Sequence, residues 1–301
     1  MIRIGIVDVD SSHATEFTRR INHCGIDEEQ WVDGAQVVAA YPGFSTAVAD
    51  AQKKNEQYTQ TLLDCGVEMV DSPEALVGMV DAAFVQSDDG RRHYAPAKML
   101  LERGVPTFVD KPMTCALAEA RELAELAAER EVPLYSASSL RYSPEVVEVA
   151  SGEAVGRVVG ADTISPSKLA VEGIPGLMYY GIHAVEILYT LLGPGCESVQ
   201  AIESPLGILV AGRWRDGRLG GVRGFVEGSA GFGFRAVGET GTRQEMVSAQ
   251  FIYRELLKQV IAMFETSKPP IDVRETLEII AFIEAALEAA RSGERVEIPT
   301  L

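Results

Sequence analysis

The chain has 301 residues and a formal net charge of −17, because 44 acidic side chains outnumber 27 basic ones. Such an acidic surface repels nucleic-acid phosphates and anionic lipid headgroups, which argues against partners of either kind. Apolar residues make up 47% of the chain. This content can fill the cores of two domains of about 100–200 residues each.

The cysteine spacing and the lengths of the apolar segments indicate the cellular compartment. Four cysteines lie far apart and without CxxC spacing: Cys24, Cys65, Cys115 and Cys196. We expect them to be core residues or free thiols rather than a disulfide framework. No apolar run reaches the roughly 18 residues of a membrane-spanning helix, and no signal peptide precedes the first strand. We therefore expect a cytoplasmic protein.

Short strands alternate with longer helical periods over residues 1–138. The strands are expected over Ile2–Val9, Gln36–Ala40, Val67–Val70, Ala82–Gln86, Thr107–Val109 and Leu134–Ser136. Strands that alternate with helices in this way build a parallel sheet with helices on both faces. We predict that residues 1–138 form a doubly wound α/β domain.

The pattern changes after the segment Arg141-Tyr142-Ser143-Pro144. The expected elements are a strand over residues 157–165, a helix over Leu177–Leu192, short strands over Cys196–Val237, helices over Phe251–Thr266 and Val273–Arg291, and an edge strand over Arg295–Ile298. The glycine-rich turns between the short strands are typical of an antiparallel sheet. This order predicts a second, α+β domain over residues 139–301.

The segment Asp110-Lys111-Pro112 follows the strand that ends at Val109. In an open α/β sheet, ligands bind at the carboxyl ends of the strands. A lysine held there, before the stiff ring of a proline, suits proton transfer to or from a bound molecule. The alternative is a structural role, in which Lys111 pairs with Asp110 at a domain boundary.

Three motifs in order carry a family resemblance. His93 opens a helix before Asp110-Lys111-Pro112, Gly181-Ile182-His183 leads to Glu186, and a closing helix ends in a Ser-Gly-Glu turn before Val296. This order resembles the Gfo/Idh/MocA family of nicotinamide-dependent oxidoreductases over nearly the whole chain. The resemblance implies a Rossmann-like first domain and a substrate-binding or oligomerisation second domain.

The resemblance also implies an activity and the residues that perform it. It implies NAD or NADP as cofactor, hydride transfer to or from a small sugar-like or polyol substrate, and a homodimer or homotetramer. Lys111 would exchange the proton and His183 would relay it, since histidine exchanges protons near neutrality. Tyr179 stands where the family often has an aspartate, and it or Tyr180 would bond a substrate oxygen. Core packing is the alternative for His183 and both tyrosines. The family precedent also allows a cis peptide bond at Lys111-Pro112.

The chain departs from the family at two turns. The first strand is followed by Asp8-Val9-Asp10-Ser11-Ser12-His13 and not by the glycine-rich turn that approaches a pyrophosphate. The second strand ends in Tyr41-Pro42-Gly43, without an acid for the ribose hydroxyls. Hydroxyls and free helix amides still offer an anion site, with plain helix capping as the alternative. The residues expected to hold the cofactor are Asp8, Ser11, Ser12, His13, Tyr41, Ser87, Asp88, His93, Asp110 and Pro112.

These departures leave two other functions open. One is a catalytically silent ligand-binding or regulatory protein that kept the fold and lost the dinucleotide. The other is a metal-assisted lyase or hydrolase built on Asp8, Asp10 and His13, with Asp88 and His93 nearby. Because no fixed-spacing metal signature is present, no metal ligand is assigned.

Two further signals are interpreted as structural. The pattern Gly231-Phe232-Gly233-Phe234-Arg235-Ala236 has dinucleotide-like spacing, but no helix follows it, so we expect an antiparallel strand. Arg141 stands beside Tyr142 near the domain junction, where it would clamp a substrate oxyanion or pair with an acid. We favour the ion pair.

Overall fold

The structure is a computed structural model that describes residues 1–168 and 171–301. The chain divides into two compact units. The first combines Met1–Ala137 with Tyr253–Val273, and the second combines Ser138–Ile252 with Arg274–Leu301. Over the described ranges, no helix combines the length and the hydropathy needed to cross a lipid bilayer.

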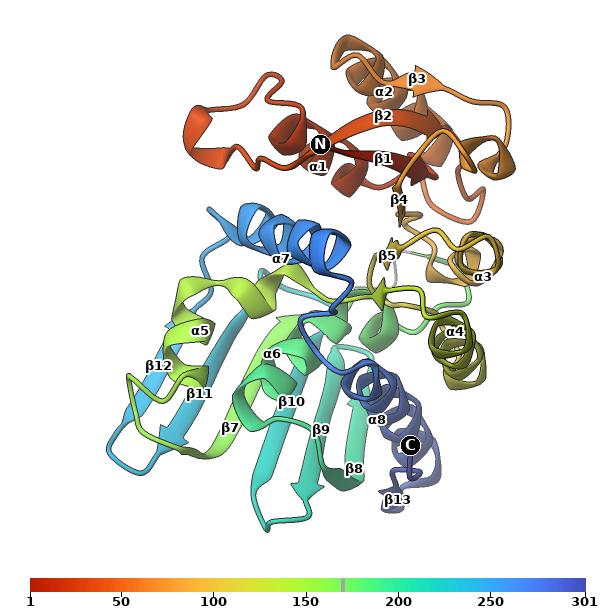
Figure 1. Cartoon of the computed structure of the whole chain (residues 1–301). Coiled ribbons are helices and arrows are strands. Elements are labelled where there is room, and N and C mark those ends of the chain that lie inside the picture. Colours follow the sequence, from red (N-terminus) through yellow and green to blue (C-terminus); the bar gives the residue numbers. More distant parts are fainter. Residues whose placement is uncertain (169–170) are drawn as a thin grey trace. The chain divides into compact units, whose positions relative to one another are not determined.

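The first unit is built on a six-stranded sheet in which every pairing is parallel (Figure 1). Its strand order is β3-β2-β1-β4-β5-β6. The strands are β1 (Ile2–Val7), β2 (Ala35–Tyr41), β3 (Glu68–Met69), β4 (Ala82–Val85), β5 (Thr107–Val109) and β6 (Leu134–Tyr135). This order confirms the doubly wound, Rossmann-like prediction.

Helices join these strands and fill the core beside the sheet. They are α1 (Ser12–Ile21), α2 (Ala51–Asp64), α3 (Tyr94–Glu102), α4 (Leu117–Arg130) and α7 (Ile252–Thr266). Ser11 starts α1 because its side-chain oxygen accepts the backbone N–H of His13. Phe17 of α1, Phe84 of β4 and Phe108 of β5 form an aromatic cluster, with the rings of Phe17 and Phe84 5.8 Å apart.

Helix α7 belongs to the first unit, although it follows the strands of the second in sequence. Phe264 stacks on Phe84 at 6.0 Å, and Arg254 donates a hydrogen bond to the carbonyl of Glu29. Leu257 and Val260 are completely buried. The prediction of one continuous domain over residues 139–301 therefore does not include the return of Tyr253–Val273 to the first unit. Its apolar stripe shows that the helix is packed, but not against which domain.

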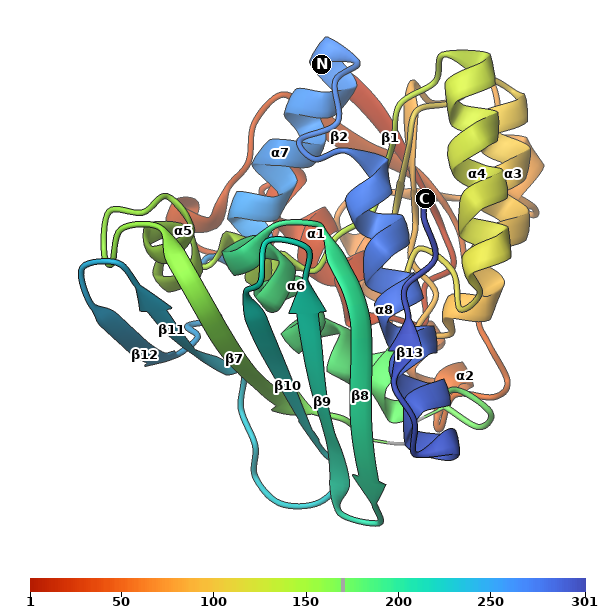
Figure 2. The ribbon, with the colours of Figure 1, turned by 90° about the horizontal axis from the view of Figure 1, so that it is seen from below.

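The second unit contains a seven-stranded mixed sheet in the order β12-β11-β7-β10-β9-β8-β13. The strands are β7 (Val158–Pro166), β8 (Cys196–Ser204), β9 (Gly207–Trp214), β10 (Leu219–Phe225), β11 (Gly233–Gly238), β12 (Thr242–Met246) and β13 (Val296–Glu297). Only β7 and β10 pair in parallel. The α+β prediction is confirmed. Figure 2 shows β7 to β10 side by side.

Helices cover one face of this second sheet. They are α5 (Pro144–Ala150), α6 (Ile182–Leu192) and α8 (Val273–Ser292). Along β9, Ile208, Val210 and Trp214 are buried, while Leu209 and Arg213 between them are exposed. This alternation is typical of a sheet with one face on a core and one face open. The glycine pattern near Gly233 lies at β11, as expected, and a side chain there would meet the carbonyl of Glu245 at 2.9 Å.

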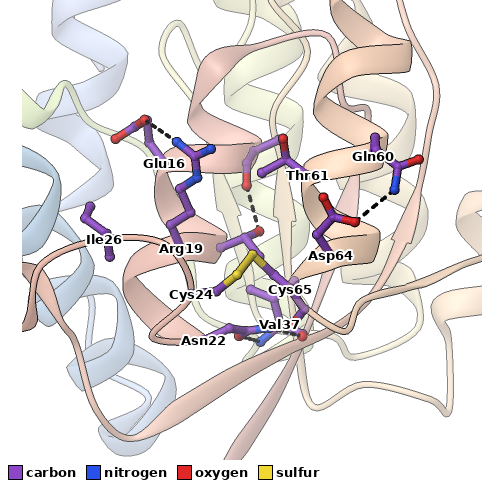
Figure 3. The surroundings of a disulfide bond; sticks show 12 residues. Glu16, Arg19, Asn22, Cys24, Ile26, Val37, Gln60, Thr61, Asp64 and Cys65 are labelled. Carbon is purple, nitrogen blue, oxygen red and sulfur yellow. Dashed lines mark hydrogen bonds and ion pairs between the residues drawn. A yellow bond between two sulfur atoms is a disulfide. The ribbon is translucent and has the colours of Figure 1, made fainter.

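The structure corrects the prediction for two cysteines. Cys24, after α1, and Cys65, at the end of α2, form a disulfide with their Cα atoms 5.6 Å apart (Figure 3). Both helices end on the same side of the sheet, where the Asn22 side chain also donates to the carbonyls of Val37 and Cys65. This proximity arises from the fold and leaves no trace in the spacing. Cys115 and Cys196 are free, as predicted.

Candidate functional site

The strand order reverses direction between β1 and β4, and ligands of doubly wound sheets bind at such a point. The loops that follow β1, β4 and β5 are joined there by side-chain hydrogen bonds. Asp10 bonds Ser87 and Asp88, His13 bonds Asp110, and His93 bonds Pro112. Most of the residues expected to hold a cofactor are therefore neighbours at one edge of the first unit's sheet.

Asp10 is completely buried and links the loop after β1 to the loops after β2 and β4 by hydrogen bonds. One carboxylate oxygen accepts the backbone N–H of Asp88 at 2.9 Å. The other accepts the backbone N–H of Ser45 at 2.7 Å and the hydroxyl of Ser87 at 3.2 Å. Burial raises the pKa of Asp10, although the two backbone hydrogen bonds oppose the rise. Because its oxygens already accept three hydrogen bonds from the protein, this carboxylate holds the loops of the edge together.

Asp8 directly follows β1 and has a positive φ of 68°. Its side chain is 2% exposed and accepts from Nε and Nη2 of Arg92, at 2.9 and 3.0 Å. The ion pair lines a cavity of about 400 Å³ that also includes Tyr41 and Glu74. Asp8 therefore brings no unpaired negative charge to the edge of the sheet.

His13 and Asp110 form a direct pair, with His13 Nδ1 at 2.5 Å from Asp110 Oδ2. Burial raises the pKa of Asp110. The charge of His13 and its hydrogen bond lower that pKa by more, with help from Lys111 and His93, so the net value is below the ordinary one. The backbone N–H of Lys111 donates to Asp110 Oδ1 at 2.7 Å. Asp110 thus keeps its negative charge and orients the imidazole of His13.

His93 is completely buried and ties the loop after β4 to the loop after β5. Its Nδ1 lies 2.7 Å from the carbonyl oxygen of Pro112, and its Nε2 lies 2.8 Å from that of Ser87. Carbonyl oxygens only accept, so both contacts are hydrogen bonds when the ring carries a proton on each nitrogen. The Lys111-Pro112 peptide bond is cis, the isomer for which the resemblance gave a precedent.

The metal alternative finds no cluster in the part of the chain that the structure describes. There, no group of three or more His, Cys, Asp and Glu side chains is placed to hold an ion. Asp8 is bonded to Arg92, and Asp10 is saturated by donors. The nitrogens of His93 both face carbonyl oxygens.

In the second unit, His183 follows a single turn of π-helix over Leu177–Gly181, a geometry that is frequent at functional sites. Its Nδ1 lies 2.7 Å from the hydroxyl of Ser138. The ring of Tyr180 is 5.6 Å from that of His183 and stacks on Phe232 at 6.2 Å. Tyr179 is buried next to Tyr180. Tyr180 therefore places its ring against that of His183.

Arg141 forms the ion pair that the sequence favoured. It donates to Glu186 at 2.8 Å and also to Glu275, and both Arg141 and Glu186 are buried. The backbone N–H of Ser138 adds a hydrogen bond to Glu186 at 3.1 Å. Burial raises the pKa of Glu186 to about 7 against the opposing charge of Arg141. This network fixes the helix that carries His183.

Residues 29–138 match the model of the GFO_IDH_MocA oxidoreductase family, which is described by an NAD-binding Rossmann fold. Over 78 residues the chain is 37% identical to YceM of Salmonella typhimurium. Residues 29–138 are therefore similar to this family. The match to YceM covers 26% of the chain and spans about a quarter of YceM itself, 25%.

Solved structures extend the likeness to the whole chain. A myo-inositol dehydrogenase from Corynebacterium glutamicum has a TM-score of 0.80 at 15% identity and covers 100% of both chains. A myo-inositol dehydrogenase from Lactobacillus casei, solved with NAD(H) and myo-inositol, has a TM-score of 0.79 at 16% identity, covering 100% of this chain and 98% of that one. GenD2 from gentamicin A biosynthesis, solved with NAD, has a TM-score of 0.80 at 17% identity, and the match covers 99% of this chain and 97% of that one. At these identities the likeness establishes the fold.

Against the Gfo/Idh/MocA pattern, the expected site residues fall into three places. Asp8 and Tyr41 line the cavity, Ser11 and Ser12 start α1, and the others cross-link the loops. Lys111 belongs to the first unit, and His183 and Tyr179 belong to the second. Sequence reasoning missed the partners of these residues: Arg92, Ser45 and Ser138. Only Arg92 had a signal, its place beside His93 in the family motif.

Proposed function

We propose that the chain is an NAD(P)-dependent dehydrogenase that transfers hydride to or from a small sugar-like or polyol substrate. The observation that carries the proposal is the cross-linked edge of the first sheet, where Lys111 follows the buried Asp110, which pairs with His13. The match of residues 29–138 to the model of an NAD-binding oxidoreductase family supports it. Inositol, the substrate in the Lactobacillus casei structure, is a polyol of the proposed class.

The residues at this edge fit a dinucleotide despite the missing glycines. Asp10 faces its own donors and Asp8 faces Arg92, so neither opposes a pyrophosphate with an unpaired charge. Gln86, directly after β4, is completely buried, and its amide has no hydrogen-bond partner among the described residues. A buried amide without a partner costs free energy, which a bound ligand can recover.

We assign each cofactor residue a role on this basis. Asp8 and Tyr41 would hold the adenosine end, since they line the cavity beside β1 and β2. Ser11, Ser12 and His13 would hold the phosphates at the start of α1. The nicotinamide end would be held by the remaining loop residues: Ser87, Asp88, His93, Asp110 and Pro112.

The bound cofactor supplies the hydride chemistry, and the protein manages position and protons. Lys111 takes the proton from a substrate hydroxyl, or returns it to a carbonyl, at its Nζ atom. Asp110 fixes the start of the Lys-Pro segment through the backbone N–H of Lys111. In the second unit, His183 is the proposed relay, and Tyr179 or Tyr180 is the proposed donor to a substrate oxygen.

The second unit also offers a surface for self-association. On the open face of the seven-stranded sheet, Ile202 of β8 is 74% exposed and lies opposite Leu209 of β9, which is 44% exposed. Leu219 of β10 is 65% exposed on the same face. Contiguous exposed apolar side chains mark association surfaces. We propose that this face forms a homodimer or homotetramer. Light scattering should give a mass of two or four chains, and Leu219→Asp should lower it toward one chain.

We propose the cytoplasm as the location, as the sequence predicted. The Cys24–Cys65 pair would then be present there as two thiols, because reducing compartments disfavour disulfides. Fractionation with thiol labelling in acid-quenched cells tests both statements. Labelled Cys24 and Cys65 in the cytoplasmic fraction are expected. A protein found elsewhere, with both residues unlabelled, would contradict the proposal.

The activity is tested by direct cofactor titration followed by a polyol panel. NADH fluorescence should rise on binding, and a polyol with the oxidised cofactor should yield the reduced form. Lys111→Ala should keep the dissociation constant of the cofactor and lower kcat by about 10²–10⁴. Lys168→Ala is a matched control on an exposed lysine of the second unit. Cofactor binding without turnover of any polyol would favour the silent ligand-binding alternative, and the absence of binding would reject the proposal.

A further inference from the structure

The end of β2 lacks the acid that usually recognises the ribose, but a carboxylate from β1 lies beside it. The backbone N–H of Asp8 donates to the carbonyl of Tyr41 at 3.1 Å, and that of Val9 donates to the carbonyl of Gly43 at 2.9 Å. The turn after β1 therefore runs along the end of β2. Asp8 sits at the point of contact between the two segments.

Gly43 makes room for this carboxylate. A Cβ atom at residue 43 would lie 2.0 Å from Asp8 Oδ1, far closer than two such atoms can approach. The positive φ of Asp8 directs its side chain into the space that Gly43 leaves open. The small residue after β2, Gly43, and the carboxylate after β1, Asp8, therefore depend on each other, because the carboxylate fills the space that the glycine leaves.

The cavity beside this carboxylate has a definite charge. Two carboxylates, Asp8 and Glu74, and one guanidinium, Arg92, line its volume of about 400 Å³. Arg92 is 38% exposed, and both of its Nε and Nη2 donors are bonded to Asp8. The charged side chains of the lining thus sum to one negative charge, and the guanidinium is already engaged.

We infer that Asp8 performs the ribose recognition that β2 has lost, and that it thereby selects NAD(H) over NADP(H). This inference rests on the proposed function. A carboxylate accepts hydrogen bonds from ribose hydroxyls. A 2′-phosphate would bring a charge of about −1.5 to −2 next to Asp8 and Glu74. Arg92 already donates two of its five N–H groups to Asp8, so its charge would be shared between that carboxylate and the phosphate.

The test compares the dissociation constants of NADH and NADPH for the whole chain and for variants at residue 8. The native chain should bind NADH at least about tenfold more tightly than NADPH, as for one hydrogen bond to a charged group. Asp8→Asn keeps the shape and tolerates the positive φ. It should weaken NADH binding by about tenfold and strengthen NADPH binding, because Arg92 becomes available to a phosphate.

A second variant and a control separate recognition from folding. Asp8→Gly removes the carboxylate, suits the positive φ, and should also lose the preference for NADH. Asp64→Asn removes an exposed carboxylate of α2 that bonds Gln60, and should leave both constants unchanged. Thermal unfolding of each variant shows that it is folded.

Three outcomes would overturn the inference in distinguishable ways. Equal binding of the two cofactors by the native chain, or tighter binding of NADPH, would reject it while leaving the proposed dehydrogenase intact. An equal loss of both cofactors in folded Asp8→Asn and Asp8→Gly would show that Asp8 is only structural. Binding of neither cofactor to the native chain would reject the proposed function together with the inference.

Discussion

Each unit buries a carboxylate near a histidine, and the two arrangements differ. In the first unit, Asp110 bonds His13 directly at 2.5 Å. In the second, Glu186 and His183 are joined through Ser138, which donates its N–H to Glu186 and shares its hydroxyl with His183. The pKa of Asp110 falls below its ordinary value, whereas burial raises that of Glu186 to about 7.

The difference shows that burial alone does not set the charge of a buried acid. Desolvation raises both pKa values, and the balance then depends on nearby cations. Asp110 has the charges of His13, Lys111 and His93 around it. Glu186 has Arg141, which also pairs with Glu275, so one cation serves two acids. The first arrangement holds a permanent charge, and the second holds an acid near its titration point.

Removal of Asp110 should have the largest effect. Asp110→Ala leaves His13 without its buried partner and should lower the free energy of unfolding by about 3–5 kcal/mol. A lowered pKa also makes Asp110 stabilising above its unfolded value near 3.8, with the contribution lost as pH falls below it. Urea unfolding from pH 2 to pH 5 should therefore show a weaker acid dependence in the variant. Asp110→Asn, which keeps the shape, should cost less. A cost below 1 kcal/mol for Asp110→Ala would contradict the importance of the pair.

The disulfide distinguishes the two units and gives the next largest effect. The Cys24–Cys65 bond closes a loop with a sequence separation of 41. Its removal should cost about 4 kcal/mol through the entropy of the unfolded chain. Trp31 lies in the first unit and Trp214 in the second, so Trp31→Phe and Trp214→Phe backgrounds report on one unit each. Cys24→Ser with Cys65→Ser should shift the Trp31 signal. Loss of stability seen mainly through Trp214 would contradict this assignment.

Glu186 should make the second unit less stable as the pH rises. Its folded pKa of about 7 lies above the ordinary value of 4.5, so its contribution is full below pH 4.5 and is lost as pH rises through 7. The expected loss between those values is about 3 kcal/mol. Glu186→Gln should remove this slope in unfolding followed by Trp214. Glu153→Gln, on an exposed residue of the same unit, should keep it. An identical slope in wild type and Glu186→Gln would show that Glu186 is charged throughout.

Much of the fold could be predicted because it depends on local patterns. The apolar run at the start of the chain indicates a buried strand without any knowledge of the partner strand, and β1 lies there over Ile2–Val7. The placement of α7 could not be predicted, because an apolar stripe does not name the surface that covers it. The Cys24–Cys65 bond escaped for a related reason, since only the packed helices bring the two sulfur atoms together.

For the site, residue types were visible in the sequence but their electrostatic state was not. Asp8 and Asp10 could be seen as carboxylates near an expected phosphate site. Their charges are compensated by Arg92 and by the N–H groups of Ser45 and Asp88, which come from distant segments. A sequence shows which groups carry charge, whereas the fold decides which donors face them.

The smallest expected effect tests the bridge between His183 and Glu186. Ser138→Ala removes the hydroxyl that lies 2.7 Å from His183 and that accepts the N–H of Leu140, but it keeps the N–H that bonds Glu186. The free energy of unfolding, measured with denaturant, should fall by about 1 kcal/mol, as for a capping residue. Its dependence on pH, which is due to Glu186, should remain. Ser143→Ala is a matched control, because the Ser143 hydroxyl is buried and has no partner among the described residues. If the free energy of unfolding falls equally in both variants, the loss comes from removing a buried hydroxyl and not from breaking the contact between Ser138 and His183. If Ser138→Ala also removes the pH dependence, Ser138 causes the difference in pKa between Asp110 and Glu186. The sharing of Arg141 between Glu186 and Glu275 is then not the cause.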